Sequence, residues 1–304
     1  MKFFKRQSGA GKARGAALCG LARRFRLQLF LAALVALYFL SAPKSEKAVT
    51  SALLNPRYEP DQIELFDPEK GSLVLSKAGA FWLGQLSLDG EGAAACENCL
   101  YFICDNIVVN KLLYNLKNLV KLYEISDKKS AAASYGLRQD RAFLLKIRQK
   151  TQVVSSLKFG SVDSLARIFL SSDKNIKVWS TDSAALAPYL TASADFWAAP
   201  EIFPKDVVGE DKKYRHGKLA VGADKKPLLA GAFDWSGALA KTFDAGDGNV
   251  YRAYFLPRAD GGYWCRFEAV PAAQRPLEEK DALKKVNAVF LVSAWTYGRV
   301  FEEE

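Results

Sequence analysis

Short hydrophobic runs that alternate with polar residues cover most of the chain after residue 60, which is the pattern of β-strands with one buried face. Proline and glycine residues separate the runs. Such residues favour tight turns between neighbouring strands. The first three runs therefore predict an antiparallel meander over residues 63–66, 73–76 and 81–86.

One longer segment has helical spacing instead. Asp105 is a residue type that caps helix N-termini, and apolar residues three or four positions apart follow it. These residues are Val108, Leu112, Leu116 and Leu119. We expect a helix here that packs one apolar face on a sheet.

The strand pattern returns after this helix. Strands are predicted over residues 120–125, 143–147 and 152–159, with a hairpin joining 167–170 to 176–179 and a short helix at 183–190. Residues 200–226 are rich in charge, Gly and Pro and indicate a long surface loop or a domain boundary.

The last third of the chain has a similar mixture. An apolar run at 228–235 precedes a hairpin that joins 250–256 to 263–269, and a helix is predicted over 276–287. Residues 289–301 fit either an extension of that helix or a terminal strand.

These elements predict an α+β fold, in which an N-terminal transmembrane helix is followed by a β-rich extracytoplasmic body with a few short helices. We expect an α+β domain over residues 61–205. A second α+β region, residues 206–304, either stands alone or completes the first domain.

The predicted transmembrane helix is residues 27–42, a stretch of 16 almost uninterruptedly apolar residues. This is slightly short of the ~20 residues that span a hydrocarbon core, so a cleaved signal peptide and a buried helix of a soluble protein are alternatives. Leu40 and Pro43 make a poor cleavage site after Ala42. A retained anchor in the lipid bilayer is therefore the favoured interpretation.

The net charge of +10 is concentrated at one end of the chain. Residues 1–26 contain eight Lys or Arg residues and no acid, which leaves +2 for everything that follows. A nearly neutral body argues against nucleic-acid binding. Cationic residues before an anchor predict that this end stays inside, so we expect a basic cytoplasmic tail (1–26), the anchor in the cytoplasmic (inner) membrane, a linker (43–60), and the body on the outer or periplasmic side.

Three cysteines form the strongest candidate for chemistry. Cys96, Cys99 and Cys104 have the spacing C-x2-C-x4-C on a loop that precedes the helix. They fit a redox dithiol, or a metal site with Cys265 or His216 as a fourth ligand. They also fit a structural disulfide among the four cysteines, or buried thiols, and we favour this structural interpretation because it suits an exported domain.

No other motif indicates catalysis. A Ser-His-Asp triad would need His216, the only histidine, but the chain has no G-x-S-x-G motif. No spacing singles out a pair of carboxylates for acid-base chemistry. We therefore assign no catalytic residue, cofactor site or metal site, and expect a protein that is not an enzyme.

Aromatic residues offer a different kind of surface. The six tryptophans are Trp82, Trp179, Trp197, Trp235, Trp264 and Trp295. Tryptophans on alternating strands usually pack in a core or on a sheet face, whereas an exposed stripe would suggest a face that binds glycans or proteins. Arg258 and Arg266 flank the last hairpin, where they fit either an anion site or a solubilising role.

The order of several short motifs resembles a known family. The motifs are Asn55-Pro56, Phe81-Trp82, Ile125-Ser126, Tyr135-Gly136-Leu137, Phe159-Gly160, Val178-Trp179 and Asp195-Phe196-Trp197. With the apolar segment before them, they are similar to the membrane-anchored extracytoplasmic domain-of-unknown-function family often found beside gliding-motility-type ABC transporter components. The resemblance covers residues 50–205 and departs from the family at residues 92–104, which carry the cysteines. It implies location and partnership, and it supplies no catalytic residues.

We therefore expect a membrane-anchored extracytoplasmic accessory or binding protein that works through protein contacts, with subunits of an ABC-type transport or envelope system as partners. One alternative is a thiol-disulfide or metal-dependent enzyme that uses Cys96, Cys99 and Cys104. The other alternative is an envelope glycan or peptide binder with an aromatic face.

Overall fold

The chain separates into two compact units, Met1–Lys47 and Ala48–Glu304. The computed structural model describes residues 25, 28, 30–35, 37, 47–88, 98–172, 175–199, 217–223, 225–244, 250–270 and 275–301. Of the residues that it describes, none lies in a helix both long and apolar enough to cross a membrane. Most of the predicted tail (1–26) and anchor (27–42) lies outside the described residues.

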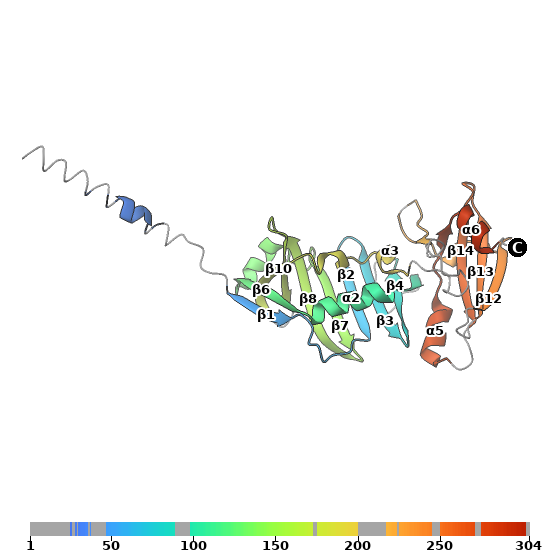
Figure 1. The fold of residues 1–304 in the computed structure, drawn as a ribbon, viewed down its shortest axis with the longest axis horizontal. Coiled ribbons are helices and arrows are strands. Elements are labelled where there is room, and N and C mark those ends of the chain that lie inside the picture. Colours follow the sequence, from blue (N-terminus) through green and yellow to red (C-terminus); the bar gives the residue numbers. More distant parts are fainter. Residues whose placement is uncertain are drawn as a thin grey trace, which may run out of the picture. The chain divides into compact units, whose positions relative to one another are not determined.

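The described strands of the second unit form two antiparallel sheets (Figure 1). The larger sheet has ten strands in the order β1-β6-β10-β9-β8-β7-β2-β3-β4-β5. Their bounds are Ala48–Ala52 (β1), Gln62–Asp67 (β2), Gly71–Ala78 (β3), Phe81–Ser87 (β4), Cys99–Ile103 (β5), Leu119–Ser126 (β6), Phe143–Gln149 (β7), Gln152–Val162 (β8), Arg167–Ser172 (β9) and Asn175–Asp182 (β10). The β-rich α+β class predicted from the sequence is confirmed.

Two meanders make up most of this sheet. Strands β2 to β5 form one meander and strands β7 to β10 form the other, and the two meet where β2 pairs antiparallel with β7. Glu64 lies opposite Lys146 at the middle of this pair, with Ile63 opposite Ile147 and Leu65 opposite Leu145 on the other face. The two meanders thus extend in opposite directions from the β2–β7 pair.

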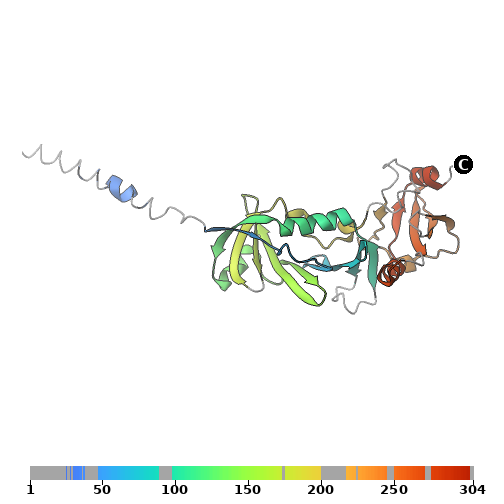
Figure 2. The same cartoon turned by 60° about the horizontal axis from the view of Figure 1, so that its bottom comes forward.

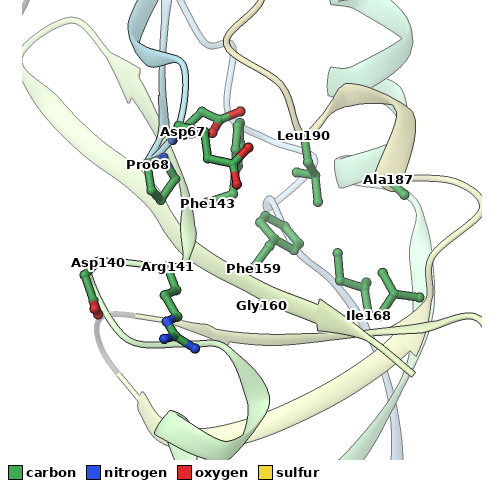
Figure 3. Close-up of a pocket in the computed structure, with 12 residues that line it drawn as sticks. Asp67, Pro68, Asp140, Arg141, Phe143, Phe159, Gly160, Ile168, Ala187 and Leu190 are labelled. Atoms are coloured by element: carbon green, nitrogen blue, oxygen red, sulfur yellow. Dashed lines mark hydrogen bonds between the residues drawn. The ribbon is translucent and has the colours of Figure 1, made fainter. Parts of the chain in front are cut away.

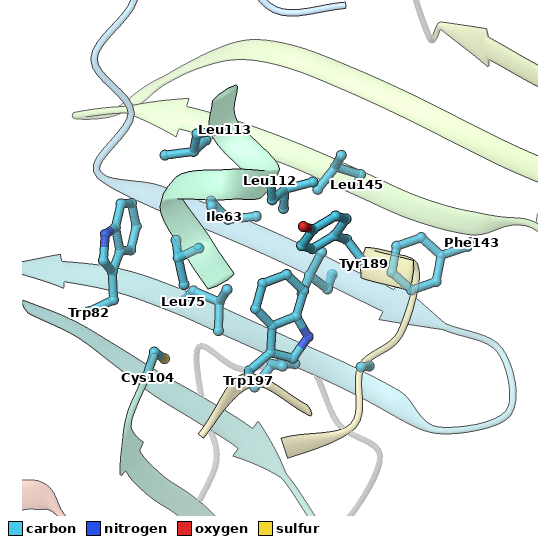
Figure 4. Close-up of a cluster of buried hydrophobic side chains, with 14 of the residues drawn as sticks. Ile63, Leu75, Trp82, Cys104, Leu112, Leu113, Phe143, Leu145, Tyr189 and Trp197 are labelled. Carbon is cyan, nitrogen blue, oxygen red and sulfur yellow. The ribbon is translucent and has the colours of Figure 1, made fainter. Parts of the chain in front are cut away.

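Helix α2 (Asn106–Lys117) covers one face of the sheet (Figures 1 and 2). As predicted, Asp105 caps it, and its carboxylate accepts hydrogen bonds from the backbone N–H groups of residues 107 and 108. Figure 4 shows Leu112 of the helix pointing towards Ile63 and Leu145 of the sheet. Helix α3 (Ala194–Trp197) follows the second meander, and its fully buried Trp197 packs in the same core.

The apolar stripe of α2 agrees with the predicted one at Leu112 and Leu116, but it includes Val109 and Leu113 and does not include Leu119. Its buried residues are Val109, Leu112, Leu113 and Leu116. Leu119 instead begins β6 and is 72 % exposed. Spacings of three, four and seven residues from Val109 place the four buried side chains on one face of the helix, which suits packing on a sheet.

The second sheet has five described strands in the order β11-β15-β14-β13-β12. Their bounds are Lys218–Leu219 (β11), Leu239–Asp244 (β12), Val250–Pro257 (β13), Tyr263–Val270 (β14) and Phe290–Val292 (β15). The hairpin of β13 and β14 is as predicted. Residues 289–301 contain both a strand, β15, and a helix, α6 (Ala294–Phe301), because the segment turns at Ser293, whose hydroxyl accepts the N–H of Thr296.

Part of the second sheet packs into the main hydrophobic core of the ten-stranded sheet. Leu219, Ala288 and Phe290 of the second region lie in the same buried cluster as the face of the ten-stranded sheet that α2 covers. Between α5 (Leu277–Lys285) and β15, Asn287 lies along the edge of β5. The region after residue 206 therefore contributes to the core of the first domain.

Three expectations differ from the structure. The predicted linker (43–60) contains β1, which pairs with β6. This strand was not predicted because β1 itself has no alternating apolar pattern, and it forms through backbone pairing with β6. The predicted cysteine loop contains β5, whose alternate residues Leu100 and Phe102 are fully buried. The predicted helix at 183–190 contains only a short 3₁₀ turn, η3 (Ala187–Tyr189), with Pro188 inside it. The apolar run at 228–235 contains another 3₁₀ turn, η5 (Ala230–Ala232), and an isolated β-bridge between Leu229 and Ala288.

Candidate functional site

The structure separates the candidate cysteines. Cys99 is disulfide-bonded, whereas Cys104 and Cys265 are free thiols. Cys104 directly follows β5 and lies in the same buried cluster as the residues of α2, while Cys265 lies in β14 within a separate buried cluster of the second sheet. Cys96 and His216 lie outside the described residues.

Burial makes both free thiols poor nucleophiles. Cys104 is 2 % exposed and Cys265 is fully buried. Burial raises the pKa of both thiols well above the usual range, and the neighbouring Asp105 carboxylate adds to the rise at Cys104. Because the thiolate is the reactive form, neither group has the low pKa that redox or nucleophilic chemistry needs. In the described part of the chain, no group of three or more His, Cys, Asp or Glu residues could hold a metal ion.

The tryptophans divide between core and surface. Trp82 and Trp197 are buried in the main core, and Trp179 packs on it half-buried. Trp295 on α6 is 54 % exposed. Trp235 and Trp264 are half-buried and lie beside arginines on the second sheet.

The register of the last hairpin creates this arginine-rich surface. Tyr254 of β13 lies opposite Arg266 of β14, and Arg252 lies opposite Glu268. Since side chains alternate across a strand, all four project from the same face of the sheet. We call this surface, together with Trp235, Arg258 and Trp264, the arginine–aromatic face.

Arg266 is at its centre. Its guanidinium carbon lies 4.5 Å from the ring centroid of Tyr254 and 5.1 Å from that of Trp235. Its Nη2 contacts Glu268 at 3.1 Å, while its Nε is buried without a hydrogen-bond partner among the described residues. Such cation–π contacts contribute roughly 0.5–2 kcal/mol each, depending on how far water is excluded.

Hydrogen bonds extend the network from Arg266. The Tyr254 hydroxyl donates to Glu268 at 2.9 Å and accepts from Arg252 at 3.5 Å. At the turn of the hairpin, Arg258 lies 4.4 Å from the Trp264 ring centroid and pairs with Asp260 at 2.7 Å. The network holds aromatic rings and guanidinium groups in fixed positions on a partly exposed surface.

An edge strand adjoins this face. Strand β12 pairs with β13, and no other strand among the described residues pairs with its second edge. Ala240, Lys241 and Thr242 are exposed, and Leu239 is 47 % exposed. Thr242 lies opposite Arg252, so the edge and the face are continuous.

The sequence indicated only part of this site. Arg258 and Arg266 were expected as a flanking pair, and the structure brings both into the face. Tyr254 was missed, although counting outward from the turn would have placed it opposite Arg266. The Trp235 contact has no such signal, because it arises from a loop that folds back on the sheet.

Comparison of the chain with known protein families, with curated proteins and with solved structures finds no match.

Proposed function

We propose that the chain is a membrane-anchored extracytoplasmic binding protein that works through protein contacts. Its contact surface is the arginine–aromatic face with the adjoining edge strand β12, and its partners are subunits of an ABC-type transport system. Residues 27–42 hold it in the inner membrane, with the body on the outer side.

The observation that carries this proposal is the composition and order of the face. Tyr, Trp and Arg are the residue types that dominate the binding energy of protein interfaces. Here Arg258 and Arg266 lie against three aromatic rings, so their side chains have already lost much of the freedom that binding would otherwise remove. The edge of β12 that no described strand covers adds backbone groups that an extended partner segment can pair with.

The same contacts weigh against a glycan-binding surface. A sugar would stack on an open ring face, but guanidinium groups already lie over the rings of Tyr254, Trp235 and Trp264. The thiol-enzyme alternative is weakened because Cys104 and Cys265 are buried with raised pKa values. The disulfide at Cys99 is typical of proteins outside the reducing cytoplasm, which supports the proposed location.

Site-specific photocrosslinking in intact membranes tests the contact surface. A photoreactive amino acid at Thr242 should crosslink the full-length protein to one transport subunit, identified by mass spectrometry. The matched control is Leu165, which is 70 % exposed in the turn between β8 and β9 and should give no such product. Arg252→Glu should lower the Thr242 yield by at least about fivefold, because it reverses a charge beside the contact.

The outcomes separate the parts of the proposal. Equal products from Thr242 and Leu165, or an unchanged yield in Arg252→Glu, would exclude the arginine–aromatic face as the contact. A specific partner that is not a transport protein would exclude the ABC partnership alone. Release of the full-length chain from membranes by alkaline carbonate would exclude the anchor.

A further inference from the structure

A cavity of about 540 Å³ opens at one end of the ten-stranded sheet, away from the arginine–aromatic face. Figure 3 shows side chains of β7, β8 and β9 on one side of it and the turn between β2 and β3 on another. Its volume is in the range of sites that bind small molecules. Both meanders contribute to its wall.

The inner wall of the cavity is apolar and fixed in place. Phe143, Phe159 and Ile168 are at most 8 % exposed, and all three belong to the main core. Gly160 lets the wall form, because a Cβ atom there would collide with the carbonyl oxygen of Tyr135. An apolar group of a ligand would therefore meet a preformed hydrocarbon surface.

The rim of the cavity is charged. Asp67 and Glu69 lie in the turn between β2 and β3, and Asp140 and Arg141 lie just before β7. One oxygen of Asp67 accepts the backbone N–H of Glu69 at 2.9 Å, which fixes the turn. Within the described part of the chain, neither Asp67 nor Glu69 forms an ion pair, whereas Asp140 pairs with Arg138 at 3.2 Å.

The rim therefore has an excess of negative charge. In Figure 3, Asp67 lies above the level of the Phe159 ring and Arg141 lies below it. A cationic group is consequently favoured at the Asp67 side, directly beside the apolar wall. A carboxylate on the same ligand would be favoured at the Arg141 side.

We propose that this cavity binds a small primary amine that carries an aromatic or branched hydrocarbon group. The ammonium group pairs with Asp67 and Glu69, and the hydrocarbon group lies on Phe143 and Phe159. This chemistry occurs in free amines, in hydrophobic amino acids and at the N-termini of peptides.

Calorimetry with a small ligand set tests the inference on the full-length protein in mild detergent, with ligand-free micelles as the blank. Phenethylamine should bind, whereas phenylpropionate, which lacks the amine, and ethylamine, which lacks the ring, should bind at least about tenfold more weakly. Phenylalanine and phenylalanine amide distinguish the sources. Tighter binding of phenylalanine would indicate a free amino acid that also uses Arg141, and tighter binding of the amide would indicate a peptide N-terminus.

The protein variants are chosen to preserve the fold. In Asp67→Asn the amide oxygen still accepts the Glu69 N–H, so the turn keeps its hydrogen bond while the charge is lost. Combined with Glu69→Gln, it should weaken phenethylamine binding by about tenfold or more. The control is Asp182→Asn, because Asp182 accepts the N–H of Ala184 at 2.8 Å in a similar turn outside the cavity.

Two results would overturn the inference. One is equal binding of phenethylamine and phenylpropionate, which would mean that the charged rim selects nothing. The other is equal loss of affinity in the Asp182→Asn control and in the double variant. A protein without crosslinked partners but with selective amine binding would refute the proposed protein-contact function and leave this site standing.

Discussion

Truncation of Asn287 tests how the two sheets are joined. Strand β5 is the last strand of the ten-stranded sheet, and Asn287 pairs with its outer edge. The Asn287 side chain accepts the N–H of Tyr101 at 2.7 Å and donates to the carbonyl of Cys99 at 2.9 Å. Its own backbone N–H donates to the carbonyl of Tyr101 at 3.1 Å.

Asn287→Ala removes the two side-chain hydrogen bonds and leaves the backbone one. Each hydrogen bond contributes about 1 kcal/mol net to stability, and a buried backbone group that loses its partner costs more. Because the site is half-buried, we expect a total loss of about 3 kcal/mol in the free energy of unfolding. For a domain of this size the melting temperature should fall by about 6–12 °C.

Urea denaturation of the unit that begins at residue 48, followed by tryptophan fluorescence, measures this loss. The control is Asn55→Ala, because among the described residues the exposed Asn55 side chain accepts only a local N–H, that of Arg57 at 3.0 Å. The control should cost less than about 1 kcal/mol. Hydrogen exchange at the Tyr101 amide should also accelerate in Asn287→Ala. A variant within about 0.5 kcal/mol of the wild type, with unchanged exchange at Tyr101, would refute the claim that Asn287 seals this edge.

Three further predictions follow from buried positions. Gly84→Ala should destabilise the protein by about 1–3 kcal/mol in thermal unfolding, because the new Cβ would collide with the Phe102 ring, whereas Gly237→Ala, with open space around it, should be nearly neutral. The folded-state pKa of Glu279 is lowered, chiefly by its hydrogen bond from Arg275, so the free energy of unfolding should fall as the pH drops below the ordinary glutamate value of 4.5. Glu279→Gln should weaken this pH dependence, and an unchanged dependence of stability on pH in the variant would contradict the assignment. Burial raises the Cys104 pKa, so the folded protein keeps a proton that the unfolded chain loses; stability should fall above pH 9.0, and Cys104→Ala should reduce this slope.

The candidate site was only partly predictable, because some of its contacts join residues close together in the sequence and others join residues far apart. The hairpin turn fixes the register of β13 and β14, so the Tyr254–Arg266 pair depends on local sequence. Trp235 reaches Arg266 through a loop with no periodic pattern, and such a contact has no local signal. The amine cavity is less predictable still, because Asp67 and Arg141 lie more than 70 positions apart and meet only when β2 pairs with β7.

The sequence by itself determined the local elements of this protein. Alternation of apolar and polar residues was enough to predict the strands of both meanders except β5, and Asp105 was enough to predict the start of α2. These features depend on interactions between near neighbours, such as side-chain alternation and a cap on the first turn. The sequence also concentrated the positive charge at one end of the chain.

Only the tertiary structure decided which elements lie together. It paired β2 with β7, paired β1 of the expected linker with β6, and placed the free cysteines in two different buried clusters. Many strand orders satisfy the same alternating pattern, because alternation specifies which face is buried and not which neighbour covers it. In the observed strand order, Asn287 binds the edge of β5, and Leu219, Ala288 and Phe290 of the second region pack in the main core. Burial of these residues favours this strand order over the others.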